Sequence, residues 1–301
     1  MKFGLNQKNK IEKWKESYGP TIEELKYGLY LWKKSLLSIV GLVLILTFVG
    51  LALIGPYLAP FDPIEINFSE KLEPPGKEHL FGTDQFGRDI LSRVIYGARI
   101  ALVVIAIVSL IGGGIGTLIG VFSGYFGGRI DTVLMRLTDI FLAFPSLILA
   151  MAFSAALGPS LINMIIAISL VIWTPYARLA RADALKAKSQ DFVEAARSIG
   201  ASDLRIIFLH ILPMCMSSII VQLTLRMGTI LLTVASLGFL GIGAQPPAPE
   251  WGAMVSDGRN YIASQWWIST FPGIMIALVV LGFSLLGDGL RDVLDPRLRR
   301  G

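Results

Sequence analysis

The sequence is poor in the residues that build metal sites and disulfides. It has one cysteine, Cys215, which cannot form an internal disulfide, and two histidines, His79 and His210. The histidines lie far apart in the sequence, so they can form neither the HExxH motif of a zinc protease nor a structural zinc site. We therefore expect no metal bound by this chain.

The motifs of nucleotide hydrolysis and of membrane proteases are also missing. No GxxxxGK[ST] loop occurs, so the chain cannot hydrolyse a nucleotide by the P-loop route. Ser160 follows Gly158 and Pro159 in a turn, but no histidine lies near it to act as a base. Asp288 lacks a second intramembrane carboxylate, apart from Asp139, with which it could share a proton. Ordinary turn and helix-end roles explain these residues, so we expect no catalytic residue.

Charge is scarce as well. Charged residues make up 16% of the 301 residues, whereas hydrophobic residues make up 53%. Several uncharged stretches reach the roughly 20 apolar residues that are needed to cross a hydrocarbon core of about 30 Å. The sequence therefore predicts an all-α, polytopic membrane protein. Six transmembrane helices are expected, at residues 36–58, 100–122, 133–155, 160–178, 214–238 and 268–287.

Lysine and arginine residues gather on one side of these six spans. They are frequent in the N-terminal tail, in the loop at 179–213 and in the C-terminal tail at 289–301, whereas the external loop at 59–99 dilutes its basic residues with acids. The positive-inside rule then places both termini in the cytoplasm. Because this distribution accounts for the net charge of +5, we expect no nucleic-acid partner.

Residues 1–35 precede the first span as a charged tail. This charged region and the apolar run after it are both too long for a cleaved signal peptide, and no small-residue cleavage pattern follows. Thr21 and Glu24 form a capping box ahead of an apolar helical pattern. We therefore predict an amphipathic cytoplasmic helix that lies on the membrane surface.

The external loop contains another helical pattern. After Asp89, apolar residues recur at helical spacing, while Ser92, Arg93 and Tyr96 face away from them. The pattern predicts a short amphipathic helix in the outer interface, ahead of the span at 100–122.

Glycine recurs at every fourth position of the second span. Small residues at this spacing line one face of a helix and let a neighbouring backbone approach closely. The pattern predicts a helix-packing seam, and a helix of a partner subunit is one candidate for the neighbour. The seam consists of Gly112, Gly116, Gly120 and Gly124.

Arg226 places a positive charge within the fifth span. A lone charge near mid-membrane costs at least about 2.5 to 3.5 kcal/mol on insertion scales, so it needs a compensating environment. Three environments stay open: a water-filled pathway, a carboxylate of another subunit, or the membrane surface if the span is shifted. Deep ionisable groups also typify secondary carriers, for which a single arginine is thin support.

The polar segment between the fourth and fifth spans has helical signals of its own. Ser189 can cap a helix at 190–199, and Gly200 can supply the left-handed conformation that ends it. Ser202 can cap a second helix that runs to His210. The first helix then either inserts into a cleft of another protein or shields lipid headgroups, and the pattern leaves both hypotheses open. Its apolar stripe consists of Phe192, Ala195, Ala196 and Ile199.

The sequence EAARSIGASDLRIIFLHILP, residues 194–213, resembles the EAA motif of ABC importer permeases. His210 stands where that family usually has an apolar residue. Three further stretches are similar to the second permease subunit of dipeptide, oligopeptide and nickel importers: GTDQFGRDILSRVIYGAR, SLGFLGIGAQPPAPEWGAMVSDGR and LLGDGLRDVLDPRLR. The positions that match the EAA motif are Glu194, Ala195, Ala196, Gly200, Leu212 and Pro213.

This resemblance implies a type I ABC importer permease fold in the plasma (inner) membrane of a prokaryote. It implies a heterodimer with a second permease subunit, two cytoplasmic ATP-binding subunits that hold ATP and Mg²⁺, and an external substrate-binding protein. The residues that match the EAA motif would form a coupling helix that docks into an ATP-binding subunit. The implied substrates are dipeptides and oligopeptides. Nickel chelates, oligosaccharides and, outside this class, a secondary carrier are the alternatives.

Overall fold

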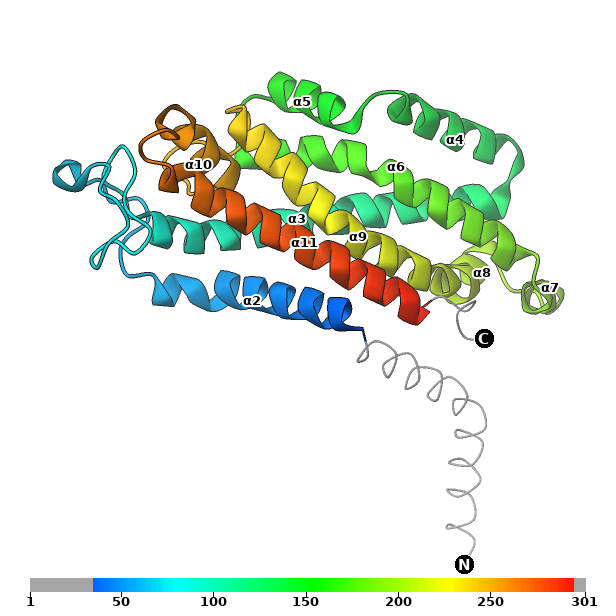
Figure 1. Ribbon diagram of the computed structural model, residues 1–301. Coiled ribbons are helices and arrows are strands. Elements are labelled where there is room, and N and C mark those ends of the chain that lie inside the picture. The colour runs from blue at the N-terminus through cyan, green and yellow to red at the C-terminus, as the bar shows by residue number, and fades with distance from the viewer. Residues whose placement is uncertain (1–34, 295–301) are drawn as a thin grey trace, which may run out of the picture.

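The computed structural model describes residues 35–294, and every regular element in that part of the chain is a helix (Figure 1). The long helices are α2 (Leu36–Leu58), α3 (Ile90–Phe126), α6 (Leu161–Lys188), α9 (Leu212–Phe239) and α11 (Trp267–Leu294). The shorter helices are α4 (Gly128–Leu142), α5 (Ser146–Leu157), α7 (Asp191–Ser198), α8 (Asp203–Ile206) and α10 (Trp251–Gly258). Single turns are η1 (Phe68–Glu70), the π-helical η2 (Ile207–Ile211) and η3 (Arg259–Tyr261). The predicted helix at Thr21 and Glu24, together with residues 295–301, lies outside the described residues.

The long helices run back and forth between two ends of a bundle. In Figure 1 the segment at 59–89 and α10 lie at one end, which we call the α10 end. The other end, the α7 end, holds α7, α8, the start of α2 and the end of α11. Five helices are long and apolar enough to cross a membrane, and the number is six if the bent pair of α4 and α5 is counted as one span. The predicted all-α, polytopic membrane fold is confirmed, and the predicted six passes agree with the count that includes the bent pair.

Two predicted boundaries are wrong because helices continue beyond their apolar residues. The outer amphipathic helix and the second span form a single helix, α3, since no helix-breaking residue separates them. Ser92 and Arg93, which were expected to face away, are both buried. The predicted loop at 179–213 begins as the last part of α6, which continues to Lys188. Hydropathy locates the part of a helix that crosses the membrane, whereas backbone hydrogen bonding extends the helix into polar residues.

The third predicted span is broken. α4 and α5 meet at an angle of 89° at residues 143–145. Pro145 causes the break, because it has no N–H for the helical ladder and restricts Phe144 to extended conformations. Both helices lie along α6 (Figure 1). Gly158, with φ of 90°, closes the predicted turn between α5 and α6.

The interior contains two apolar clusters. The first lies towards the α10 end and includes Phe48, Met164 and Trp251. The second lies towards the α7 end and combines residues of α3, α6, α7, η2 and α9, among them Val193 and Cys215. Because α7 contributes to the second cluster, the polar segment is packed onto the bundle.

Candidate functional site

α7 is anchored by one face and exposed on the other. Val193 and Ala196 are buried in the second apolar cluster. Ile199, at the end of the helix, has an exposed fraction of 86%. The predicted apolar stripe is therefore divided: Ala196 faces inward, whereas Phe192, Ala195 and Ile199 remain on the surface.

A glycine turn closes α7. Gly200 has φ of 82°, the predicted left-handed conformation, and its N–H donates to the carbonyl of Arg197 at 3.0 Å. The N–H of Ala201 donates to the carbonyl of Ala196 at 3.1 Å. No described atom lies within 4 Å of a Cβ built at Gly200, so the backbone conformation requires glycine there and crowding does not. Glu194, on the preceding turn, is exposed.

The two predicted serine caps are not formed. Ser189 ends α6, and its hydroxyl donates to the carbonyl of Lys186 at 2.9 Å. Gln190 occupies the N-cap position of α7 in its place. Ser202 stands at the N-cap position of α8, but its side chain makes no capping hydrogen bond. The local orientation of the backbone decides which hydroxyl can reach a free N–H, and a sequence pattern does not specify that orientation.

The second predicted helix does not end at His210. α8, η2 and α9 follow one another without a break from Asp203 to Phe239. Pro213 lies directly after the π-helical turn η2, where the regular ladder of helical hydrogen bonds is already interrupted, and Leu212 packs against the second apolar cluster. The ring centroid of His210 lies 6.2 Å from that of Phe192. His210 therefore contacts α7 of its own chain.

Tyr125, near the end of α3, forms hydrogen bonds with both α7 and α8. Its hydroxyl donates to Oδ1 of Asp203, at the start of α8, at 2.5 Å. Nη2 of Arg197, on α7, donates to the same hydroxyl oxygen at 3.4 Å. A movement of α7 is thereby linked to the long helix α3.

The predicted glycine seam is an internal contact between α3 and α6. A Cβ at Gly116 would lie 2.2 Å from the carbonyl oxygen of Trp173, and a Cβ at Gly120 would lie 2.2 Å from that of Ala177. The neighbour of this seam is therefore α6 of the same chain, and the partner-subunit helix considered from the sequence is not required. The same close approach to α6 occurs at the other two seam glycines, Gly112 and Gly124.

Arg226 lines a cavity of about 190 Å³ between α4, α5, α6 and α9, which is open to the surface because lining residues such as Ser146 and Thr229 are exposed. Its side chain is half-buried, and no lining residue carries a negative charge. Within the described part of the chain, Arg226 forms no ion pair. The arginine therefore lies beside a partly open cavity with its charge uncompensated by residues 35–294.

The α10 end holds a buried network of charged residues. Nε of Arg88 donates to Oδ2 of Asp84 at 2.6 Å, and Nε of Arg93 lies 3.7 Å from the same oxygen. Nδ1 of His79 lies 2.9 Å from Oδ1 of Asp89, and Nε2 of the same ring lies 3.3 Å from Oε2 of Glu70. Burial by itself would lower the pKa of His79, but the two carboxylates outweigh it and raise the pKa above its usual value. These pairs hold the segment at 59–89 against the start of α3.

Glu250 caps α10 from a buried position. Its carboxylate accepts hydrogen bonds from the N–H groups of Gly252 and Ala253, each at 2.8 Å. Burial raises the pKa of Glu250 to about 7, although these two hydrogen bonds act in the opposite direction. The indole of Trp251, the next residue, donates to the carbonyl of Val94 at 3.0 Å and ties α10 to α3.

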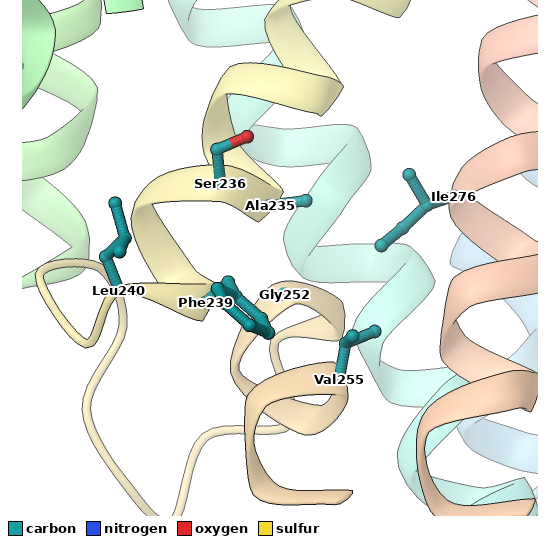
Figure 2. A pocket seen from close by; sticks show the side chains of 7 residues that line it. All are labelled: Ala235, Ser236, Phe239, Leu240, Gly252, Val255 and Ile276. Atoms are coloured by element: carbon teal, nitrogen blue, oxygen red, sulfur yellow. The ribbon is translucent and has the colours of Figure 1, made fainter. Parts of the chain in front are cut away.

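A hollow of about 330 Å³ opens between α9, α10 and α11 (Figure 2). Figure 2 shows Phe239, Val255 and Ile276 around it. Among the described residues, Ser236 is the one polar side chain that lines it, and its hydroxyl already donates to the carbonyl of Leu232 at 2.7 Å. The hollow offers apolar contact without a charged group, unlike the cavity at Arg226.

These features lie within a sequence that matches a known family. Residues 116–300 match the family model of binding-protein-dependent transport system inner membrane components, and this match covers more than half of the chain. The chain belongs to this family of permeases. A second model, for the N-terminal TM domain of oligopeptide transport permease C, matches residues 30–75 of the permease.

Curated relatives of the permease align over nearly their whole length. The dipeptide transport system permease protein DppC of Alkalihalophilus pseudofirmus is 49% identical over 89% of this chain and 88% of the relative. The probable D,D-dipeptide transport system permease protein DdpC of Escherichia coli is 46% identical over 89% and 90%. DppC of Haemophilus influenzae is 43% identical over 90% and 94%. The permease is thus a transport subunit and not an enzyme.

Solved structures show the same fold. A chain of the inward-facing MetNI methionine ABC transporter superposes with a TM-score of 0.54 at 19% identity, covering 67% of this permease and 96% of that chain. This likeness supports the type I ABC importer permease fold. As a member of its family, the permease is a multi-pass inner-membrane protein that works with ATPase and other permease subunits.

Three features of the site have no counterpart among the predicted residues. They are the link through Tyr125, the buried charges at the α10 end and the carboxyl of Glu250. Each depends on burial or on partners that are distant in sequence, so no local sequence pattern predicts it. The one available signal was the density of charged residues around Asp84 and Asp89 in an otherwise apolar protein.

Proposed function

We propose that the permease forms half of the translocation pathway of an ATP-driven importer for dipeptides and oligopeptides. The peptide substrate is supported by relatives named for dipeptide transport, which align with this chain over about 90% of its length. The complete importer contains a second permease subunit, two ATP-binding subunits that hold ATP and Mg²⁺, and an external substrate-binding protein. The permease itself binds no cofactor.

The exposed apolar face of α7 carries the coupling part of this proposal. Phe192, Ala195 and Ile199 lie on the surface of a helix whose adjacent face, formed by Val193 and Ala196, is buried. An apolar patch on a firmly seated helix suits insertion into a groove of an ATP-binding subunit, because burial of apolar surface on both sides stabilises the contact. Gly200 sets the turn that presents this face.

Orientation follows from the same assignment. We place the α7 end in the cytoplasm and the α10 end outside. The basic residues of the 179–213 segment support this placement, because positively charged segments of short loops are retained in the cytoplasm. The external binding protein then delivers substrate to the α10 end.

Docking is tested by placing a charged side chain on the exposed apolar face of α7. Ala195→Arg should leave the assembled complex intact but lower substrate-stimulated ATP hydrolysis and peptide uptake by roughly tenfold or more, because it buries an unpaired charge in the interface. Ser198→Arg adds the same side chain at an exposed position on the polar side of α7 and should have a much smaller effect. Wild-type coupling in the Ala195→Arg complex, reconstituted in proteoliposomes, would exclude docking through this face.

Orientation and docking can be read from one labelling experiment. Cys215 is fully buried, so a cysteine placed at Ile199 is the reactive thiol of the described region. Ile199→Cys should react with a membrane-impermeant maleimide only after permeabilisation, and the ATP-binding subunits should protect it. Glu78→Cys, exposed at the α10 end, should react in intact cells with or without those subunits. Labelling of Ile199→Cys in intact cells would reverse the proposed orientation.

The energy source and the substrate are tested by uptake of a labelled dipeptide. Uptake should stop when ATP is depleted and continue in the presence of an uncoupler, whereas a secondary carrier would show the reverse pattern. Excess unlabelled dipeptide should compete, and nickel chelates or oligosaccharides should not. Competition by either of these two classes in place of peptides would reassign the substrate and leave the importer mechanism standing.

A further inference from the structure

We propose that the cavity beside Arg226 is the binding site for the carboxylate of the transported peptide. This inference rests on the proposed import of peptides and adds the residue that recognises the negative end of the substrate. It concerns a site within the membrane-spanning bundle, apart from α7 and from the binding protein.

The position of Arg226 requires a compensating negative charge or water. Arg226 lies near the middle of α9, and its half-buried side chain lines a cavity of about 190 Å³. A charged side chain at mid-membrane depth is costly unless it faces a cavity or a partner, and such residues mark substrate pathways. A space of this size holds several water molecules or a small polar group of a ligand.

The surrounding helices supply no free carboxylate for this arginine. α5 and α9 contain no acidic residue, and the acids of α4 and α6 form ion pairs with arginine or lysine residues of α6. The cavity therefore keeps the uncompensated positive charge of Arg226. The pairs that occupy the other acids are Asp131 with Arg181, Asp139 with Arg178 and Asp183 with Lys186.

The rest of the lining suits a carboxylate on an otherwise apolar ligand. The hydroxyls of Thr174 and Thr233 already donate to backbone carbonyls, whereas that of Thr229 has no acceptor among the described residues and can donate to a carboxylate. The other lining residues are mainly apolar, such as Ile168. A guanidinium binds a carboxylate through two parallel hydrogen bonds, which gives both affinity and orientation. Free peptides carry one carboxylate at the C-terminus, so the site favours peptides over neutral oligosaccharides.

The first test compares two substrates in the complete importer in proteoliposomes, with the binding protein saturated. The probes are labelled alanyl-alanine and its C-terminal amide. Arg226→Gln should lower uptake of the free dipeptide by roughly tenfold or more, the usual effect of losing a charged hydrogen bond, and should change uptake of the amide by less than about twofold. Arg226→Lys, the control that retains the charge, should preserve most of the preference for the free dipeptide.

A second pair of variants leaves Arg226 in place. Thr229→Glu puts a carboxylate one turn along α9, where it can pair with Arg226 and compete with the substrate. Uptake of alanyl-alanine should fall by roughly tenfold or more relative to Thr229→Gln, which has nearly the same size and carries no charge. Equal uptake by the two variants would overturn the inference. This pair decides the question if Arg226→Gln does not assemble or if the wild type does not carry the amide.

The outcomes separate this inference from the proposed function. If the wild-type complex shows no ATP-dependent dipeptide uptake, the peptide importer assignment itself fails. If the wild type imports the dipeptide but Arg226→Gln lowers both probes equally, Arg226 pairs with a carboxylate of another subunit and the inference is overturned. Unchanged uptake of the free dipeptide by Arg226→Gln, or by Thr229→Glu, overturns it as well.

Discussion

Adding one methyl group at Gly116 should separate α3 from α6. The Cβ of Gly116→Ala would lie 2.2 Å from the carbonyl oxygen of Trp173, so reaching even 3.0 Å requires a shift of 0.8 Å in backbone atoms. Two packed helices cannot absorb this by rotating a side chain. Overpacking of this kind lowers the free energy of unfolding by roughly 1 to 3 kcal/mol. Gly116→Ala should lie at the upper end of that range, because the atom it meets belongs to the backbone.

The matched control lies two residues away on the same helix. A Cβ at Gly114 would meet no described atom within 4 Å, so Gly114→Ala should be neutral or stabilise the helix by up to about 1 kcal/mol. Gly112→Ala should fall between the two, because a single side-chain methyl of Ile172 lies at 2.3 Å while the nearest backbone atoms of α6 lie at 3.7 Å.

The assay is SDS-induced unfolding of the purified permease in mixed micelles, followed by tryptophan fluorescence. We expect the order of stability Gly114→Ala, Gly112→Ala, Gly116→Ala, with about 2 to 4 kcal/mol between the first and the last. If Gly116→Ala and Gly114→Ala agree within about 0.5 kcal/mol, the α3–α6 seam is not as tight as the structure has it.

Two further perturbations test the ends of the bundle. Because burial raises the pKa of Glu250 from 4.5 to about 7, its contribution to stability is fully present below about pH 4.5 and is lost as pH rises through 7. Thermal unfolding between pH 5 and 8 should show this decline, worth up to about 3 kcal/mol, and Glu250→Gln should flatten it; an unchanged slope in the variant would assign the decline to another group. At the α7 end, Tyr125→Phe removes the hydroxyl shared by Asp203 and Arg197 while the ring stays, so stability should fall by about 1 kcal/mol and less peptide should be imported per ATP hydrolysed. Wild-type values for that ratio would show that the link transmits no movement.

Local sequence signals predicted the elements that depend on nearby residues. The length of the apolar runs predicted the membrane-spanning helices. A glycine after a helical pattern predicted the left-handed turn at Gly200, and Gly158 with Pro159 predicted the turn before α6. The pattern at Phe192 and Ala195 also identified a helix with an apolar surface. Where these predictions were wrong, as with the caps at Ser189 and Ser202, the chain direction set by packing decided which groups could meet.

The sequence by itself determined that this chain is a polytopic, all-α membrane protein and which polar segment forms a helix with an exposed apolar surface. Periodicity and hydropathy suffice for these properties because neighbouring residues on one helix produce them. Only the tertiary structure decided that the glycine seam faces α6, that Ala196 points inward, that Pro145 bends a span by 89°, and that Arg226 borders a cavity. Each of these depends on contacts between helices that are distant in sequence, and on which faces remain uncovered once those helices have packed.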